Sequence, residues 1–294
     1  MAQSYRGRFA PSPTGPLHFG SLLSALASYL DARANAGTWL VRLEDVDGTR
    51  CAPENHASII HTLESYHLIS DEEILIQSDR TDLYEHYLDQ LRAQQQVYPC
   101  NCTRADLKAF GGLHSKRCDS STDKPHSWRA QCDQGQYQYL DPIQGTQTFD
   151  LALDRNHPVL KRKDDYFSYQ LAVVVDDHLQ NITDIVRGAD LLDTTGQQLW
   201  LYDQFGWQAP SLCHLPLIVN SVGDKISKQN HAKAIANGDL ATLKAALSYL
   251  GYPNIPSALV TIETLLKWAV THWSRTLPKA GNLPLAPEDQ HFIQ

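Results

Sequence analysis

The N-terminal part of the chain has an apolar pattern that predicts one βαβ unit. Apolar residues recur at every third or fourth position over residues 20–36, which is the spacing of the buried face of a helix. Strands are predicted on either side of this helix, at residues 6–10 and 39–45. Residues 11–16 (Pro-Ser-Pro-Thr-Gly-Pro) end the first strand, because proline has no N–H for a β-ladder. The order strand, loop, helix, strand implies parallel strands and a right-handed crossover.

The rest of the chain continues this alternation of strands and helices. Leu171–Val175 is a continuous apolar run, as expected for a strand that is covered on both faces. Thr194 or Thr195 is predicted to cap a helix that runs to Phe205. Further strands are predicted at 182–187 and 215–219, and further helices at 53–69, 80–96, 239–250 and 257–273. The pattern predicts an α/β fold with a Rossmann-type, doubly wound parallel sheet.

The residue composition changes near the middle of the sequence. Residues 97–165 hold three clustered cysteines, the Gly111-Gly112 pair and short polar and aromatic stretches, which predicts an insertion with a small fold of its own. The two halves of the main α/β domain are then expected at residues 1–96 and 166–235. Residues 236–294 are expected to form a short helical C-terminal region.

Composition and charge narrow the class of protein. Hydrophobic residues make up 42% and charged residues 20% of the chain, as in ordinary globular proteins. No apolar run is long enough to span a membrane and the N-terminus has no signal-peptide pattern, so we expect a cytoplasmic protein. The net charge of -8 implies that any RNA contact is confined to one face. The densest basic run, Lys161-Arg162-Lys163, is either a solvated turn or a set of phosphate contacts.

The first candidate for chemistry is the loop that joins the first strand to the first helix. His18-Phe19-Gly20-Ser21 spans the end of this loop and the start of the helix, in a crevice where open α/β sheets bind ligands. A helix N-terminus presents N–H groups and a positive dipole end, which suit phosphate. His18 is positioned to bond a phosphate oxygen, and Gly20 allows the backbone to approach a nucleotide.

A second candidate follows the last predicted strand. Gly223-Asp224-Lys225-Ile226-Ser227-Lys228 places two lysines three residues apart in a loop. Two ammonium groups on a mobile loop are able to close over developing negative charge and stabilise it.

The clustered cysteines predict a metal site. Cys100 and Cys102 are two residues apart in an extended segment, so their thiolates point to one face. A glycine turn would bring His114 and Cys118 back to them, and three Cys with one His form a closed tetrahedral zinc set. Two alternatives remain open, in which Cys132 is a ligand or the cysteines are buried thiols without metal.

The histidine and lysine motifs together resemble the two signature motifs of class I glutamyl-type tRNA synthetases, whose first motif reads His-x-Gly-His. Ser21 stands here at the fourth position of that motif, and Ile226 and Gln229 differ from the Lys-Met-Ser-Lys-Ser form of the second. The resemblance covers residues 5 to about 235. It implies that Lys225 and Lys228 are catalytic and stabilise the leaving pyrophosphate, and that Lys228 also binds ATP. It also implies a structural zinc in the insertion.

The same resemblance implies a set of glutamate-binding residues: Arg8, Ser12, Glu44, Tyr169 and Arg187. Two arginines and one acid match the two carboxylates and one ammonium of glutamate. Three of the five have a simpler alternative. Tyr169 is also compatible with a core aromatic, and Arg187 with a rim ion pair to Asp184 or Asp190. Glu44 is one of several acids in the segment 44–47.

Within that family, the resemblance is to short members that have no anticodon-binding domain after the catalytic region. These members activate L-glutamate with ATP and Mg²⁺ without tRNA. These transfer the glutamate to queuosine, a modified base in the anticodon loop of tRNA(Asp), and we expect a monomer with this activity. Three alternatives stay open: an ordinary glutamyl-tRNA synthetase, a nucleotidylyltransferase or pantothenate-synthetase-like ligase, and a catalytically silent RNA-binding or regulator-binding relative.

Overall fold

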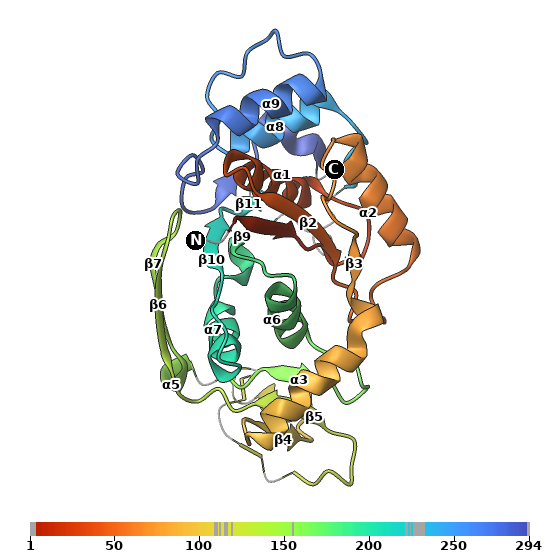
Figure 1. Ribbon diagram of the computed structural model, residues 1–294, viewed down its shortest axis with the longest axis vertical. Coiled ribbons are helices and arrows are strands. Elements are labelled where there is room, and N and C mark those ends of the chain that lie inside the picture. The colour runs from red at the N-terminus through yellow and green to blue at the C-terminus, as the bar shows by residue number, and fades with distance from the viewer. Residues whose placement is uncertain are drawn as a thin grey trace.

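The centre of the molecule is a five-stranded parallel sheet with the strand order β10-β9-β1-β2-β3 (Figure 1). Its strands are β1 (Arg6–Phe9), β2 (Thr38–Leu43), β3 (Leu75–Ile76), β9 (Asp184–Gly188) and β10 (Ser211–Leu215). The computed structural model describes residues 4–108, 111, 113–114, 117–118, 120–154, 156–220, 223, 225 and 233–292. The α/β fold with a parallel sheet is thus confirmed.

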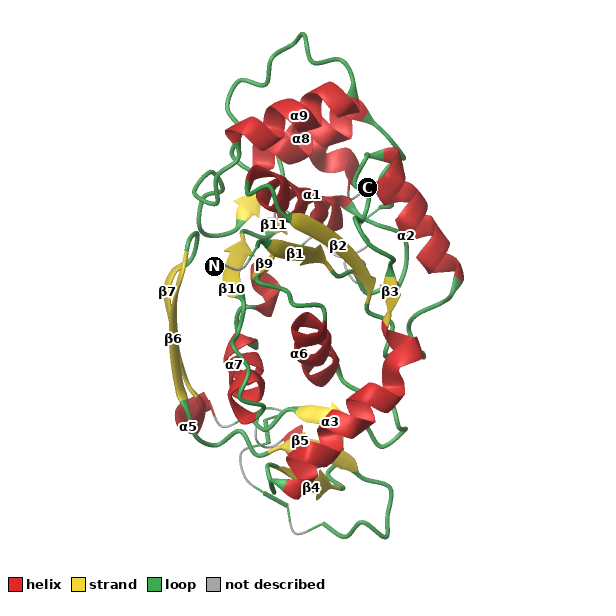
Figure 2. Cartoon of the chain, viewed as in Figure 1, coloured by secondary structure: helices red, strands yellow, loops and turns green. Residues whose placement is uncertain are grey.

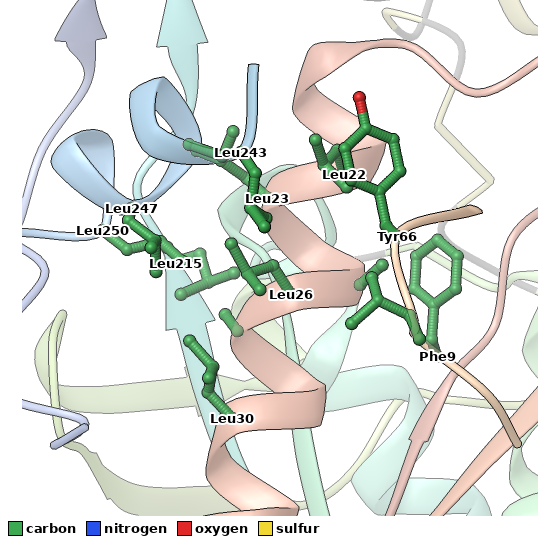
Figure 3. Close-up of a cluster of buried hydrophobic side chains, with 14 of the residues drawn as sticks. Phe9, Leu22, Leu23, Leu26, Leu30, Tyr66, Leu215, Leu243, Leu247 and Leu250 are labelled. Carbon is green, nitrogen blue, oxygen red and sulfur yellow. The ribbon is translucent and has the colours of Figure 1, made fainter. Parts of the chain in front are cut away.

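One face of the sheet is covered by α1 (Phe19–Ala34), α8 (Leu240–Tyr249) and α9 (Ile262–His272). The leucine repeat that predicted α1 forms its buried stripe, and this stripe packs against α8 and the end of β10 (Figure 3). The labelled contacts are Leu23, Leu26, Leu30, Leu215, Leu243, Leu247 and Leu250. On the other flank of α1 lie Phe9 and Tyr66 (Figure 3).

On the opposite side of the sheet lie α6 (Tyr169–Leu179) and α7 (Thr195–Gln204), and α3 (Thr81–Ala93) packs against α6 further from the sheet (Figure 1). The strand prediction for Leu171–Val175 is therefore wrong, because these residues form the middle of α6. A short apolar run fits a buried strand or a buried helix equally well. Here residues 171–177 are all buried, so the helix lacks the polar face that would have revealed its period.

The middle of the chain forms two small sheets away from the main one (Figure 2). An antiparallel sheet contains β4 (Val97–Cys100), β5 (Ser127–Ala130) and β8 (Val159–Lys161). A hairpin of β6 (Gln136–Asp141) and β7 (Gly145–Asp150) extends to the edge strand β10 of the main sheet. The main sheet thereby meets a segment that lies more than sixty residues earlier in the chain than β10.

The remaining elements are short. They are α2 (Glu54–Ser65), α4 (Arg104–Leu107), α5 (Leu151–Asp154), β11 (Ile218–Val219) and β12 (Leu283–Pro284), with 3-10 turns at Gln77–Arg80, Ala189–Leu191 and Pro287–Phe292. The strand predicted at 215–219 is divided between the end of β10 and β11, and β11 pairs with β12 of the C-terminal segment. Among the described residues, no helix is long and apolar enough to cross a membrane.

Candidate active site

A cavity of about 560 Å³ opens at the carboxyl ends of β1, β2 and β9. This is the edge at which open parallel sheets bind ligands. Eight of the predicted site residues line it: Arg8, Ser12, His18, Gly20, Glu44, Tyr169, Arg187 and Lys225. Lys228, also predicted, lies outside the described residues. Segments separated by more than 200 residues in sequence thus share one cavity.

His18 is the N-terminal cap of α1. Its Nδ1 accepts a hydrogen bond from the Ser21 N–H at 3.2 Å. Because an accepting Nδ1 carries no proton, neutral His18 carries its proton on Nε2. The capping role and a phosphate-binding role are therefore compatible, since each uses a different ring nitrogen.

Arg8 belongs to a buried charge network that the sequence did not indicate. Its Nε and Nη2 donate to Oδ1 and Oδ2 of Asp177, both at 3.0 Å. Arg42 Nη2 donates to Asp177 Oδ1 at 2.8 Å and to Glu44 Oε1 at 3.0 Å. Two arginines and two acids, all buried, therefore hold one another in place. Asp177 lies on α6 and fixes the orientation of the Arg8 guanidinium in the cavity wall.

Charge and burial act in opposite directions in this network. Burial alone would raise the pKa of Asp177, but the adjacent Arg42 and Arg8 charges hold that pKa below its usual value. For Glu44, burial dominates and its pKa is raised, although Arg42 and Arg8 oppose the change. Burial and the Glu44 charge also raise the pKa of Tyr169, so the Tyr169 hydroxyl stays protonated beside that acid.

Arg187, on β9, is held by three hydrogen bonds on the other side of the cavity. Its Nε donates to His214 Nε2 at 3.0 Å, Nη1 to Gln198 Oε1 at 2.7 Å and Nη2 to Thr195 Oγ1 at 2.9 Å. Neither Asp184 nor Asp190 is among its recorded partners, so the rim ion pair considered from the sequence is not formed. Among the residues that the structure describes, the partners of Arg187 are an imidazole, an amide and a hydroxyl, and none is a carboxylate.

The cavity wall is positive overall. It carries the cationic side chains of Arg8, Arg50, Arg187 and Lys225, and the carboxylates of Glu44 and Asp190. Lys225 Nζ forms an ion pair with Asp190 at 2.5 Å. An excess of positive charge in a cleft favours anionic ligands such as nucleotides and acidic amino acids.

The predicted metal ligands form one cluster. The ligand atoms of Cys100, Cys102, His114 and Cys118 all lie within 4.8 Å of one another, and the cluster is able to hold a metal ion. His114 Nε2 is 3.3 Å from Cys100 Sγ and 3.0 Å from Cys118 Sγ. The Cys102 and Cys118 sulfurs are 3.5 Å apart. Tetrahedral zinc with bonds of about 2.0–2.3 Å would separate its ligand atoms by roughly 3.5–3.8 Å, so the donor set and its size fit zinc.

A second layer of polar contacts orients the histidine of this cluster. The Tyr98 hydroxyl lies 2.9 Å from His114 Nδ1 and 2.8 Å from His157 Nδ1. Such a contact fixes the ring so that Nε2 faces the thiols. Cys132 is not part of the cluster, because it is buried in the apolar core formed with α3 and α6. Gly111, in the predicted turn, has φ 65°, which suits glycine, and Gly112 lies outside the described residues.

The basic run 161–163 is engaged by nearby acceptors. Lys161 pairs with Glu85 and Asp165, and Arg162 pairs with Asp164 and Asp47. Lys163 donates to the backbone carbonyl of Asn101. These contacts favour the solvated-turn interpretation of the run over a dedicated phosphate site.

Comparison with known proteins identifies the family. The family model described as the catalytic domain of class I tRNA synthetases (E and Q) matches residues 4–117 and 112–246. The chain belongs to the class I tRNA synthetase family. As a member, this synthetase is a ligase-type enzyme.

Similar curated proteins cover nearly the whole synthetase. Glutamyl-Q tRNA(Asp) synthetase of Salmonella paratyphi A is 44% identical over 95% of both chains. The protein of that name from Chromobacterium violaceum is 44% identical over 96% of this chain and 97% of its own.

Among solved structures, a glutamate-tRNA synthetase from Elizabethkingia anophelis superposes on the synthetase with a TM-score of 0.81 at 22% identity. The match covers 99% of this chain and 70% of that one. A glutamate tRNA ligase from Elizabethkingia meningosepticum, solved with its amino acid, gives a TM-score of 0.79 at 23% identity. At this level of identity the likeness establishes the fold that the synthetase shares with them.

Proposed function

We propose that this synthetase activates L-glutamate with ATP and Mg²⁺, without tRNA, and transfers it to queuosine in the anticodon loop of tRNA(Asp). The observation that carries the proposal is the placement of Arg8, Glu44 and Arg187 in one cavity together with His18 and Lys225. The names of relatives that are 44% identical over 95% of the chain support the amino acid and the acceptor.

Glutamate recognition rests on the complementary charges of the cavity. Arg187 and Arg8 present guanidinium groups from two strands, and Glu44 presents a carboxylate beside them. Since Arg8 uses Nε and Nη2 to bind Asp177, its contact with substrate is made through Nη1. A glutamate carboxylate accepts charge-assisted bonds from these arginines, whereas the side-chain amide of glutamine carries no charge. We assign the substrate ammonium to Glu44 and a further substrate contact each to Ser12 and Tyr169.

Activation joins the α-carboxylate of glutamate to ATP. A carboxylate oxygen attacks the α-phosphorus, the bond to the pyrophosphate oxygen breaks, and pyrophosphate leaves. His18 donates from Nε2 to a phosphate oxygen at the start of α1, and Gly20 lines the same part of the cavity. Lys225 and Lys228 stabilise the charge on the leaving group, with Lys225 exchanging Asp190 for pyrophosphate. Magnesium binds with ATP and neutralises its phosphates.

Transfer requires a hydroxyl that attacks the carbonyl of glutamyl-adenylate and expels AMP. Queuosine carries a cyclopentenediol whose neighbouring hydroxyls resemble those of a terminal ribose, so the same cavity suits this acceptor. We further propose that zinc binds Cys100, Cys102, His114 and Cys118 and joins the end of β4 to the chain that follows it.

Exchange of labelled pyrophosphate into ATP, measured without tRNA, tests the activation step. We expect exchange with glutamate and none of comparable size with glutamine or aspartate. Arg187→Gln removes the guanidinium and should raise the KM for glutamate by at least about tenfold, since a bond to a charged group contributes roughly 1.5–3 kcal/mol. Arg162→Gln, which removes an arginine that pairs with Asp164 outside the cavity, is the matched control. Exchange that appears only when tRNA is added would favour an ordinary glutamyl-tRNA synthetase.

A further inference from the structure

A buried chain of polar groups runs from the β6–β7 hairpin to Arg187. Asp141 Oδ2 lies 2.8 Å from His214 Nδ1, and His214 Nε2 accepts from Arg187 Nε at 3.0 Å. The exposed fractions are 1% for Asp141, 0% for His214 and 4% for Arg187. Only Arg187 lines the cavity, so Asp141 and His214 act on a ligand only through it.

The partners of His214 fix where its proton lies. An ionised carboxylate only accepts hydrogen bonds, so His214 Nδ1 must carry the proton that points to Asp141. Arg187 Nε–H only donates, so His214 Nε2 must be an unprotonated acceptor. Both conditions are met by a single neutral tautomer of the imidazole. Protonated His214 would instead direct an N–H at Arg187, which has no acceptor to offer.

The hairpin tip forms hydrogen bonds to the backbone of β10 as well as to the imidazole of His214. Asp141 Oδ1 accepts from the N–H groups of Ile143 and Gln144, both at 2.9 Å, and its Oδ2 accepts from the His214 N–H at 2.9 Å. Gln144 Nε2 donates to the His214 carbonyl at 2.9 Å. The hairpin thus binds His214 through its N–H, its C=O and its ring, at an edge strand of the main sheet (Figure 1).

We propose that the tip of the β6–β7 hairpin positions Arg187 for glutamate, with Asp141 holding His214 in the one neutral tautomer that can accept from the guanidinium. Within the described part of the chain, Arg187 has no direct carboxylate partner, and its plane is set by His214, Gln198 and Thr195. Loss of the His214 contact frees Nε and lets the guanidinium rotate away from the geometry that binds a carboxylate. The proposal rests on the assignment of Arg187 to glutamate binding.

A consequence is that glutamate binding depends on pH through His214. The titratable and charged groups that face it are Asp141 and Tyr139 from β6, Arg187 from β9 and Asp190 from the 3-10 turn after β9, with Thr195 of α7 also near the ring. Burial lowers the pKa of His214 and the Arg187 charge adds to this, against the opposing effect of Asp141. Since the folded pKa lies below the ordinary value of 6.5, the neutral form is present at neutral pH and is lost only on acidification below that value.

The test is the glutamate KM in pyrophosphate exchange, measured with the KM for ATP over a series of pH values. His214→Leu should raise the glutamate KM by at least about tenfold, equivalent to about 1.4 kcal/mol, with the KM for ATP changed by less than about twofold. His214→Gln restores an acceptor near the Nε2 position and should recover part of that loss. Its glutamate KM should also lack the rise that we expect for the unmodified protein as the pH falls below 6.5 and His214 becomes protonated.

Cys213→Ala is the control for a general disturbance of β10. Cys213 is fully buried on the same strand, and its side chain points to the opposite face of the sheet. It should lower the melting temperature and leave the glutamate KM unchanged. A KM rise in Cys213→Ala equal to that in His214→Leu, or the same acid response in His214→Gln as in the unmodified protein, would overturn the positioning role.

Two further measurements distinguish a failure of the positioning role from a failure of the proposed function. Absence of glutamate-dependent exchange in the unmodified protein counts against the function itself, whereas exchange with an unchanged glutamate KM in His214→Leu counts against the positioning role alone. Nitrogen NMR of histidine-labelled protein, with His214 assigned from the His214→Gln spectrum, reports the tautomer directly. We expect a proton on Nδ1 at neutral pH, and a proton on Nε2 would contradict the proposal.

Discussion

Replacement of Asp177 by asparagine tests the buried network that holds Arg8. The Asp177 carboxylate accepts from Arg8 Nε and Nη2 at 3.0 Å and pairs with Arg42 Nη2 at 2.8 Å, and its side chain is 2% exposed. An amide of the same shape leaves two buried guanidinium groups with Glu44 as the remaining acid between them. Removing one partner of a buried ion pair typically costs about 3–5 kcal/mol.

A matched surface pair provides the control. Arg162 donates to Asp164 through the same atoms, Nε to Oδ1 at 2.9 Å and Nη2 to Oδ2 at 2.5 Å, but the Asp164 side chain is 46% exposed. Asp164→Asn should therefore cost about 0–1 kcal/mol. With about 2 °C per kcal/mol for a chain of this size, the melting temperature should fall by about 6–10 °C in Asp177→Asn and by no more than about 2 °C in Asp164→Asn.

Thermal unfolding followed by circular dichroism, at several pH values, completes the comparison. The pKa of Asp177 is held below its ordinary value of 3.8, so its contribution to stability is present above that pH and is lost as pH falls through the folded pKa. The difference in melting temperature between the unmodified protein and Asp177→Asn should accordingly be largest near pH 7 and become smaller in strong acid. Equal melting temperatures for the Asp177 and Asp164 variants at pH 7 would refute the reasoning. Asp177→Asn should also raise the glutamate KM, because Arg8 loses its fixed orientation.

Other variants separate the remaining roles. Lys228→Ala should lower kcat for pyrophosphate exchange by about 10²–10³ while changing the glutamate KM little, because its charge acts on the leaving group in the transition state; near-normal exchange would remove Lys228 from the mechanism. Arg187→Ala should instead raise the glutamate KM more than it lowers kcat. Elemental analysis of protein purified without added metal should give one zinc per chain, and Cys118→Ser should lose it. Full stability and activity without metal would instead indicate buried thiols, and zinc retained by His114→Ala with unchanged affinity would assign the fourth position to another group.

The periodic part of the sequence predicted the N-terminal βαβ unit, and eight of the candidate site residues line one cavity. Leucines at helical spacing located α1, and the loop before it located His18, because both signals are local in the chain. The apolar run in α6 misled, since burial on every side removes the helical period. The sequence did contain one polar signal at this segment, because Asp176 and Asp177 directly follow the apolar run that was predicted as a strand.

The partners of the site residues were not accessible from the sequence. Arg8 and Asp177 are 169 residues apart, and Asp141 and His214 are 73 apart. Such distant residues form specific buried contacts in the folded protein, but no local sequence pattern indicates which arginine pairs with which aspartate. Asp177, Arg42, Asp141 and His214 were therefore missed, whereas the metal cluster was found because its four residues fall within a short segment.

Transfer of labelled glutamate to purified tRNA tests the central claim most directly. The protein should be incubated with ATP, Mg²⁺ and radiolabelled glutamate, together with tRNA(Asp) that carries queuosine, tRNA(Asp) that lacks it, or tRNA(Glu). We expect label on the queuosine-bearing tRNA(Asp) and on its isolated anticodon stem-loop, and none on the other two. Label on the terminal adenosine of tRNA(Glu) would contradict the account and identify an ordinary glutamyl-tRNA synthetase.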